Sequence, residues 1–515
     1  VPAVRGAEGP MIQVAGGAML PAGAGRPEPA PSPFVHMPGR YRTLLAGFFV
    51  AYLLAVATVS FFTRSGSALI VLALGLFIAL RLVPLLAWRR EYGWFHPLVF
   101  GILVTALELL RSFTLYAWGL DRHVALPGHD ADQLGALVAY ELLLSSFGLV
   151  AYYIGYWLFP VPPLAKVRFT RPPSMGWKAV GAVVFSGLVL LYFLRAQGGL
   201  VNHLMSWGQG RAVSLAGEGY WLPLMSTGAL SCLIWLAVQP NAIRSPLLWA
   251  CMTASAAVLY LYNGSRTAVV YLLIIGLIAW MLAARRIAYT RVLLAAVMGL
   301  FLIGALGEVR KSTWTGTLSW TGAVEVGFGE TMRRVVTGEL VERNTTSRGS
   351  LPVLARVPDE VPLVYGNTYL AVLALPVPRK LWPGKPGLVD GRVGRTFFGY
   401  NYGIPIGPVA EAVWNFHVPG VFIVFLLFGV LHRWMARAFV QHAASPAVYP
   451  VYAILLWMLA SPTSMGLVAT VTHVVPILGL LLLFGGIRKA QRRTVRWGVP
   501  GVPAPLPASP ALTRR

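Results

Sequence analysis

The chain has 515 residues, of which 57% are hydrophobic and only 12% are charged, and its mean hydropathy is +0.66. Soluble domains carry about twice that share of charge, so the composition excludes an ordinary soluble protein and indicates a chain that crosses a membrane several times. The net charge of +24 suits anionic lipids as well as nucleic acid, and because no soluble basic domain is visible we expect membrane lipids and no nucleic acid as partners.

The first forty residues contain no apolar segment long enough to span a membrane, and the apolar segments come after them. Residues 1–40 are rich in Pro, Gly and Ala, which predicts a disordered cytoplasmic tail and not a cleavable signal peptide. About twelve segments of roughly twenty apolar residues then predict transmembrane helices, the first nine within residues 41–308 and the last three within 410–487. Their centres lie near Ala51, Gly75, Leu107, Gly148, Leu188, Leu230, Ser255, Gly276, Met298, Phe425, Leu455 and Leu478.

Two further segments are too polar to span a membrane. Residues 309–409 form one large loop, in which we expect short helices that lie on the bundle and no independent domain. Residues 488–515 are basic and rich in proline and predict a second cytoplasmic tail. Cys232 and Cys251 both lie in apolar segments, so no disulfide framework or cysteine metal site is expected. The predicted fold class is an all-α polytopic membrane protein with about 12 transmembrane helices and one large external loop, which is periplasmic if the chain is a bacterial inner-membrane protein, as the resemblance given below implies.

The linkers between the predicted helices determine the orientation. Five of them are basic and fall on one side when the helices are threaded alternately: WRREYGW, AKVRFTRPPSMGWK, ARRIAYTR, HRWMARAF and RKAQRRTVRW. The positive-inside rule makes that side cytoplasmic. Both termini are then cytoplasmic, and the loop 309–409 faces outward, because long loops are exempt from the charge rule.

Charges within or beside the apolar segments indicate function, because they cost free energy there. Arg266 follows Gly264 and Ser265 at the outer start of a predicted helix, where a helix N-terminus favours anions. An arginine at that depth also reaches phospholipid headgroups without any catalytic role. Glu108 and Arg111 are three residues apart on one helix, and a structural pair explains them.

The outer loop contains PVPRKLWPGKPG, residues 376–387, which is too rich in proline and charge to be a transmembrane helix. Arg379 offers paired hydrogen bonds to phosphate, and Lys380 and Lys385 add point charges. Rigid prolines would lower the ordering cost of binding, and Trp382 is suited to stacking on a sugar face. The same tryptophan and prolines also suit a stiff loop anchored at the membrane interface.

A late helix is predicted to begin in the segment IGPVAEAVWNFHVPG. Glu411 lies at its outer mouth among cations and is a candidate general base, with Asn415 and His417 close by in the sequence. The carboxylate would equally serve to pair with an arginine or to stabilise the helix start. Asn415, His417 and Arg348, another cation of the outer loop, are candidate substrate-binding residues.

Three of these segments, in this order, resemble the O-antigen polymerase (Wzy) or oligosaccharide-repeat-unit polymerase family. GSRT opens a helix, PRKLWPGKP closes the large outer loop, and AEAVWNFHVPG resembles the family's Glu and Asn-Phe-Gly pattern at the start of a late helix. The motifs cover roughly residues 260–435, and the topology covers the whole chain. His417 departs from the pattern, because glycine is usual at that position.

The resemblance implies a glycosyltransferase of the GT-C class in the bacterial inner membrane, with its active site facing the periplasm. It would join undecaprenyl-diphosphate-linked oligosaccharide repeat units into O-antigen or a related surface polysaccharide. Arg379 and Arg266 would stabilise the departing diphosphate, and Glu411 would act as the base. No metal or other cofactor is implied, and the expected partners are lipid-linked glycans, membrane lipids and a protein that regulates chain length.

Three other classes of protein share parts of these features. An O-antigen ligase has a similar topology, uses lipid A-core as acceptor and has arginines and a histidine on the outer face, so His417 keeps that alternative open. A metal-dependent GT-C transferase has an acidic pair in its first outer loop, whereas that loop here is TRSGS, without a carboxylate. A transporter or flippase tends to have symmetric repeats, and no clear internal repeat is visible.

Overall fold

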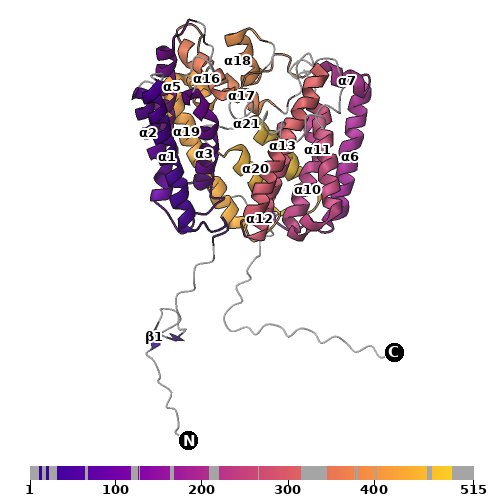
Figure 1. Cartoon of the computed structure of the whole chain (residues 1–515). Coiled ribbons are helices and arrows are strands. Elements are labelled where there is room, and N and C mark those ends of the chain that lie inside the picture. The colour runs from indigo at the N-terminus through magenta and orange to yellow at the C-terminus, as the bar shows by residue number, and fades with distance from the viewer. Residues whose placement is uncertain are drawn as a thin grey trace, which may run out of the picture.

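A computed structural model describes residues 11–13, 19–21, 32–63, 68–117, 126, 128–162, 167–207, 220–264, 266–314, 345–375, 377, 381–400, 403–460 and 467–489. Within these residues almost all regular structure is helical, and the strands form two short antiparallel ribbons. Long helices stand side by side in a bundle, and three short helices lie across one end of it (Figure 1). The predicted all-α class is therefore confirmed.

The bundle contains α1 (Gly39–Thr63), α2 (Ala68–Leu86), α3 (Pro97–Ala117), α5 (Ala131–Leu158), α6 (Met175–Ala196), α10 (Thr227–Val238), α11 (Pro246–Asn263), α12 (Arg266–Ala284), α13 (Tyr289–Trp314), α19 (Pro408–His442), α20 (Val448–Met458) and α21 (Leu467–Leu483). Shorter connecting helices are α7 (Leu200–Ser206), α9 (Trp221–Met225) and the 3-10 helix η2 (Pro240–Arg244). We call the three short helices at one end the cap: α16 (Thr345–Arg356), α17 (Asn367–Leu373) and α18 (Val389–Phe398). The ribbons pair β1 (Met11–Gln13) with β2 (Met19–Pro21), and β3 (Val167–Phe169) with β4 (Ile487–Lys489).

The apolar helices support the prediction of a membrane protein. Among the described residues, 6 helices are long and apolar enough to cross a membrane: α1, α2, α5, α6, α13 and α19. Shorter apolar segments lie in α3, α10, α12, α20 and α21. Every predicted span centre falls within a helix, and the count of about 12 spans stays a prediction.

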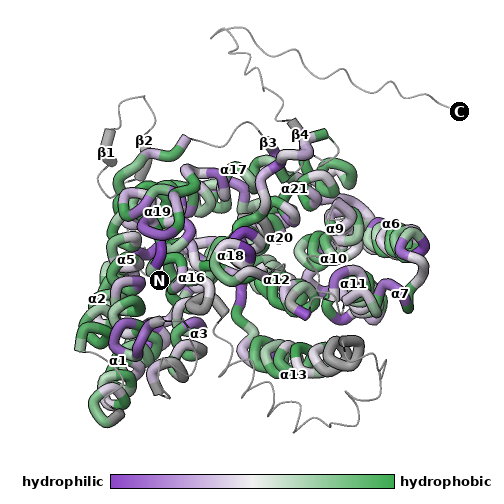
Figure 2. Tube along the Cα trace, turned by 90° about the horizontal axis from the view of Figure 1, so that it is seen from above, coloured by the Kyte–Doolittle hydropathy of each residue, from purple (hydrophilic) through white to green (hydrophobic). Residues whose placement is uncertain are grey.

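The hydrophobic core has two parts that α19 joins. One part is built mainly from α1, α2, α3, α5 and the cap end of α19, and the other mainly from α10, α11, α12, α20 and α21. Phe425 of α19 lies in the first part and Phe439 in the second. Seen from above, the two groups of helices flank the middle of the bundle, and α13 stands at its edge (Figure 2).

Glycines allow α5 and α19 to pack closely along their length. A Cβ atom on Gly155 would collide with the Leu426 carbonyl, and one on Gly429 would collide with the Tyr152 carbonyl. Small residues at such positions let helix backbones approach each other within a membrane, where van der Waals packing drives association. This contact fixes α19, and therefore its cap end, against α5.

Contacts between distant segments lie at the end of the bundle away from the cap (Figure 1), and HRWMARAF, which was predicted to be a linker, belongs to α19. Trp94 N donates to the Val35 carbonyl at 3.0 Å, and Arg433 Nη1 donates to the Phe159 carbonyl at 2.8 Å. The β3–β4 ribbon likewise joins residues 167–169 to residues 487–489. These contacts agree with alternate threading of the helices. That this end faces the cytoplasm stays a prediction.

Part of the segment 1–40, which was predicted to be a disordered tail, is described: β1 and β2 lie within it, and residues 32–40 lead into α1 and begin that helix. Phe34 and Met37 are 2% and 1% exposed, because residues 32–38 pack on the linker before α3. At the other end, residues 488–489 of the predicted second tail belong to β4. The rest of that tail lies outside the described residues.

The expectation of short helices in the large outer loop holds where the loop is described. The helix α13 continues past residue 309 to Trp314, so the loop begins later than predicted. The cap helices α16 and α17 then pack against α5, α19 and α21. Residues 315–344 lie outside the described part of the chain.

Candidate functional site

The helix α19 is interrupted near its cap end. Phe416 (φ −143°, ψ 17°) and His417 (φ 56°, ψ −156°) leave helical geometry. Pro419 explains the break, because it has no N–H for the carbonyl of Asn415 and its ring collides with that carbonyl. The result is a short helix, residues 408–415, followed by a longer helix that begins after His417.

The segment just before α17 binds the carbonyl groups that the break exposes. Val364 N donates to the Trp414 carbonyl at 3.1 Å, and Tyr365 N donates to the Asn415 carbonyl at 3.2 Å. Gly366 follows with φ 81° and begins α17. The start of α17 is therefore fixed directly against the break in α19.

Hydrogen bonds from both sides of this junction orient Glu411. Thr368 Oγ1 of α17 donates to Glu411 Oε1 at 2.7 Å. Asn415 Nδ2 donates to Thr368 Oγ1 at 2.7 Å and to the Glu411 carbonyl at 2.8 Å. Asn415 and Thr368 are 0% and 1% exposed. Such buried support gives the carboxylate a defined position, which a general base requires.

Buried polar atoms without partners lie on the two segments that hold Glu411. Within the described residues, no hydrogen bond reaches Asn367 Oδ1, the Tyr369 hydroxyl, Trp414 Nε1 or Asn415 Oδ1. Buried polar atoms are usually hydrogen-bonded. These four atoms belong to residues adjacent to Thr368 or within four positions of Glu411, and a ligand that is rich in hydroxyl groups would supply partners for them.

A second carboxyl group, Asp390, lies in the first turn of α18, where the residue is exposed. Asp390 interacts electrostatically with Glu411. Partial desolvation of the carboxyl group raises the pKa of Asp390 from its usual 3.8 to about 6, although the residue as a whole is exposed. The Arg392 guanidinium lies 5.7 Å from the centre of the Trp414 ring. The cap therefore adds an acid and a cation to the surroundings of Glu411.

We expect Asp390→Asn to change how stability depends on pH. The folded chain binds this proton more tightly than the unfolded chain, so the stability that the group contributes below pH 4 is lost as the pH rises through 6. Asparagine does not titrate, so the variant should match the parent near pH 4 and be more stable at pH 7, by an amount that solvent screening keeps small because Asp390 is exposed. Thermal unfolding across this pH range measures the effect. Asp359→Asn, an exposed carboxyl in the same loop, is the control, and identical pH profiles for parent and D390N would contradict the prediction.

His417 stands in a backbone conformation that glycine prefers. Its φ of 56° and ψ of −156° lie at the edge of a region that essentially only glycine occupies. This backbone conformation is a physical reason why glycine would be favoured at position 417, as in the Asn-Phe-Gly pattern that the segment resembles. The imidazole is half-buried at the break, close in sequence to Asn415.

Replacing His417 by glycine should therefore stabilise the protein, by about 1–3 kcal/mol of relieved strain. His417→Ala is the matched variant, because it removes the imidazole but keeps a Cβ atom and the strain. A rise in Tm for H417G alone is the expected result. Equal Tm values for the two variants would show that the backbone at this position is not strained.

Arg266 fastens two helices together. It is the first residue of α12, as predicted, after Gly264 (φ 61°) has ended α11. Arg266 Nη1 donates to the Ile303 carbonyl of α13 at 2.9 Å, and Gly307 leaves room for the guanidinium. No contact between Arg266 and Glu411 occurs among the described residues. Binding of a diphosphate by Arg266 stays a prediction.

The segment 376–387 is only partly described. Lys385 Nζ donates to the carbonyl groups of Leu375 and Val377, each at 3.0 Å, so this lysine closes its own loop. The Trp382 side chain is 39% exposed, which leaves part of its ring accessible. The structure thus gives Lys385 a role in loop shape, and its predicted contact with substrate stays a prediction.

The side chains of several residues that the sequence analysis singled out lie outside the described part of the structure. Arg379 and Lys380 are outside the described residues. Arg348 belongs to α16 and Arg111 to α3, but neither side chain is described. The suggested pair between Glu108 and Arg111 therefore stays a prediction.

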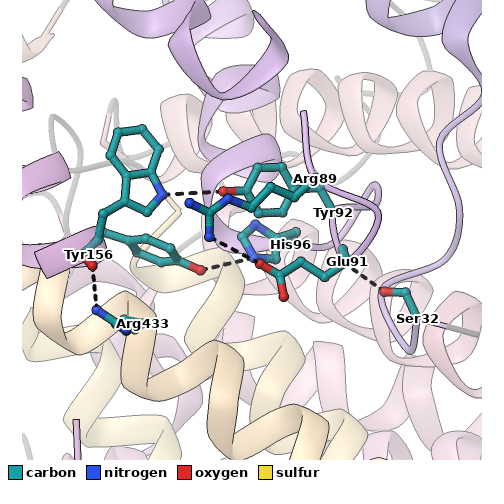
Figure 3. Close-up of polar contacts among 8 residues, drawn as sticks. Ser32, Arg89, Glu91, Tyr92, His96, Tyr156 and Arg433 are labelled. Carbon is teal, nitrogen blue, oxygen red and sulfur yellow. Dashed lines mark hydrogen bonds and ion pairs between the residues drawn. The ribbon is translucent and has the colours of Figure 1, made fainter. Parts of the chain in front are cut away.

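A second polar cluster lies at the basic end of the bundle (Figure 3). The Tyr156 hydroxyl is hydrogen-bonded to His96 Nε2 at 3.0 Å, and Trp157 Nε1 donates to the Tyr92 hydroxyl at 3.4 Å. Arg433 Nη1 donates to the Trp157 carbonyl at 2.9 Å. These bonds attach the α2–α3 linker and α19 to the end of α5, so their role is structural.

A buried arginine and a buried histidine join helices deeper in the bundle. Arg81, which is 2% exposed, donates to Thr105 Oγ1 at 2.8 Å and to the Gly101 carbonyl at 3.0 Å. The Tyr152 hydroxyl is hydrogen-bonded to His432 Nδ1 at 2.7 Å. Polar side chains in a membrane bundle commonly join helices in this way.

Thr368 and Asp390 are the site residues that the sequence analysis missed. The sequence contains only a weak indication of Thr368, because a single hydroxyl residue between Asn367 and an apolar segment is not distinctive. Asp390 had a clearer signal as the first-turn acid of an amphipathic helix. No family model, curated protein or solved structure matches the chain.

Proposed function

We propose that the chain is a membrane glycosyltransferase, an oligosaccharide polymerase of the GT-C class. It would join undecaprenyl-diphosphate-linked repeat units into O-antigen or a related surface polysaccharide at the periplasmic face of the inner membrane. The observation that carries the proposal is the Glu411 junction. There, a half-buried carboxylate oriented by Thr368 and Asn415 lies between the cap and the break in α19, at the end of the bundle away from the basic linkers.

In this proposal the donor and the acceptor are both lipid-linked glycans. The bond between the donor sugar and its lipid diphosphate breaks, and a glycosidic bond to a hydroxyl oxygen of the acceptor forms. Glu411 takes the hydroxyl proton, and the diphosphate leaves as an anion that Arg379, Lys380 and Arg266 stabilise. The lipid diphosphate supplies the free energy, so neither a nucleotide sugar nor a metal is required.

The experiment is reconstitution of the purified chain in vesicles with a lipid-linked repeat unit, in excess EDTA. A ladder of products longer than one repeat unit is the expected result. A strict requirement for Mg²⁺ or Mn²⁺ would overturn the mechanism in which arginines neutralise the diphosphate.

The same assay separates the proposal from its alternatives. A ligase would transfer preformed polysaccharide to lipid A-core and make no longer chains. The H417G and H417A variants add a test, because a ligase that depends on His417 for catalysis would lose activity in both, whereas the proposed polymerase, with Glu411 as its base, should lose only what the imidazole contributes to substrate binding. Movement of the lipid-linked glycan across the vesicle without any product would indicate a transporter or flippase.

A further inference from the structure

A pocket of about 550 Å³ lies at the basic end of the bundle, beside β3. Its walls come from β3 and the residues after it, the end of α10, the end of α12 and the turn between α19 and α20. Arg168 and Arg171 supply guanidinium groups, while Ala237, Val238 and Tyr449 supply apolar and aromatic surface. The volume falls within the range of about 300–1,000 Å³ that is typical of small-molecule sites.

The ribbon beside this pocket brings like charges together. Arg168 of β3 and Arg488 of β4 are directly opposite each other in the register. Like charges at such positions destabilise a strand pair, and neither arginine forms an ion pair within the part of the chain that the structure describes. A smaller pocket of about 240 Å³ shares Pro240 with the first and is lined by three more arginines: Arg244, Arg286 and Arg291. An anion would neutralise this charge.

Further donors lie in or next to the pocket wall. Ser445 lines the pocket, and its hydroxyl oxygen is buried without a hydrogen-bond partner among the described residues. His442 Nε2 is also buried without a hydrogen-bond partner among the described residues. The His442 ring lies 5.2 Å from the ring of Phe169, which also lines the pocket. A hydroxyl and an imidazole are both suited to donate to phosphate oxygens.

The position of the pocket favours a lipid over a soluble anion. Apolar helices end around it, and exposed tryptophans mark the same level: Trp177 near the start of α6 and Trp249 near the start of α11 are 78% and 45% exposed. Tryptophans are enriched where the hydrocarbon of a membrane meets its headgroups. Basic pockets between helices at that level bind phosphate headgroups.

We propose that this pocket binds the phosphate group of an anionic phospholipid, with Arg168 and Arg171 as its main contacts. The apolar wall would then face the glycerol and upper acyl chains. The site is independent of the proposed catalytic function, because it lies at the other end of the bundle. Lipid binding would stabilise the pairing of β4 with β3.

The test measures the Tm of the delipidated, detergent-solubilised protein with added phosphatidylglycerol, phosphatidylcholine or inorganic phosphate. Phosphatidylglycerol should raise Tm and phosphatidylcholine should not. The rise should disappear in the double variant Arg168→Gln/Arg171→Gln and persist in Arg90→Gln, which removes an exposed arginine from the same end of the bundle.

Three outcomes would overturn the proposal. No rise in the parent means that the pocket has no such ligand. An undiminished rise in the double variant means that the lipid binds elsewhere. An equal rise with inorganic phosphate, lost in the double variant, means that the pocket binds a soluble anion. If the double variant does not fold, Arg168→Lys serves instead, since it keeps the charge and should retain only part of the rise.

Discussion

Replacement of Glu411 by glutamine should lower polymer formation by about 10²–10⁴-fold, the usual cost of losing a general base. The amide keeps the shape of the side chain, and its oxygen can still accept the hydrogen bond from Thr368, which is 2.7 Å long in the parent. It cannot take a proton from the acceptor hydroxyl. The measurement is polymer formed per folded enzyme from a lipid-linked repeat unit in vesicles.

Two further variants show whether the loss belongs to the carboxylate. Glu360→Gln removes an exposed carboxylate of the outer loop that pairs with Arg356 at 3.6 Å, and it should leave turnover unchanged. Thr368→Val removes the hydroxyl between Asn415 and Glu411, and it should reduce turnover less than E411Q because the base remains. Turnover near that of the parent in E411Q would exclude Glu411 as the base and direct attention to His417.

Replacement of Arg379 by alanine should reduce polymer formation by about 10²–10³-fold, if loss of one charge-stabilising donor costs what it does at other anionic transition states. Arg379→Lys should recover little, because a fork of paired donors becomes a single point charge. The protein should remain inserted and folded, as judged by gel filtration and helical circular dichroism. Arg266→Ala should act in the same direction, and part of its loss should appear as lower Tm, because Arg266 also binds the Ile303 carbonyl.

The control for these cations is Arg356→Ala, which removes an arginine from the cap that already has a carboxylate partner. Its turnover should match that of the parent. Full activity in Arg379→Ala would mean that the segment 376–387 is a stiff loop at the membrane interface without a role in binding the diphosphate.

The sequence by itself determined the features that depend on local pattern. Long apolar runs predict helices wherever the backbone must satisfy its own hydrogen bonds in lipid, and every predicted span centre lies in a helix. Prolines and glycines likewise located the ends of elements, as at Gly264 before α12. The basic linkers predicted that AKVRFTRPPSMGWK and RKAQRRTVRW lie on the same side, and the β3–β4 ribbon, which joins residues 167–169 to 487–489, agrees with this.

Only the tertiary structure decided which residues surround Glu411. Thr368 is 43 positions away in the sequence, and no local pattern relates the two residues. Their contact arises because Pro419 breaks α19, which exposes two carbonyl groups that the start of α17 then binds. Packing likewise decided that Arg266 would bind a helix carbonyl and that His417 would adopt a glycine-like backbone. Such outcomes depend on which buried polar groups find partners, and that is settled only when distant segments are brought together.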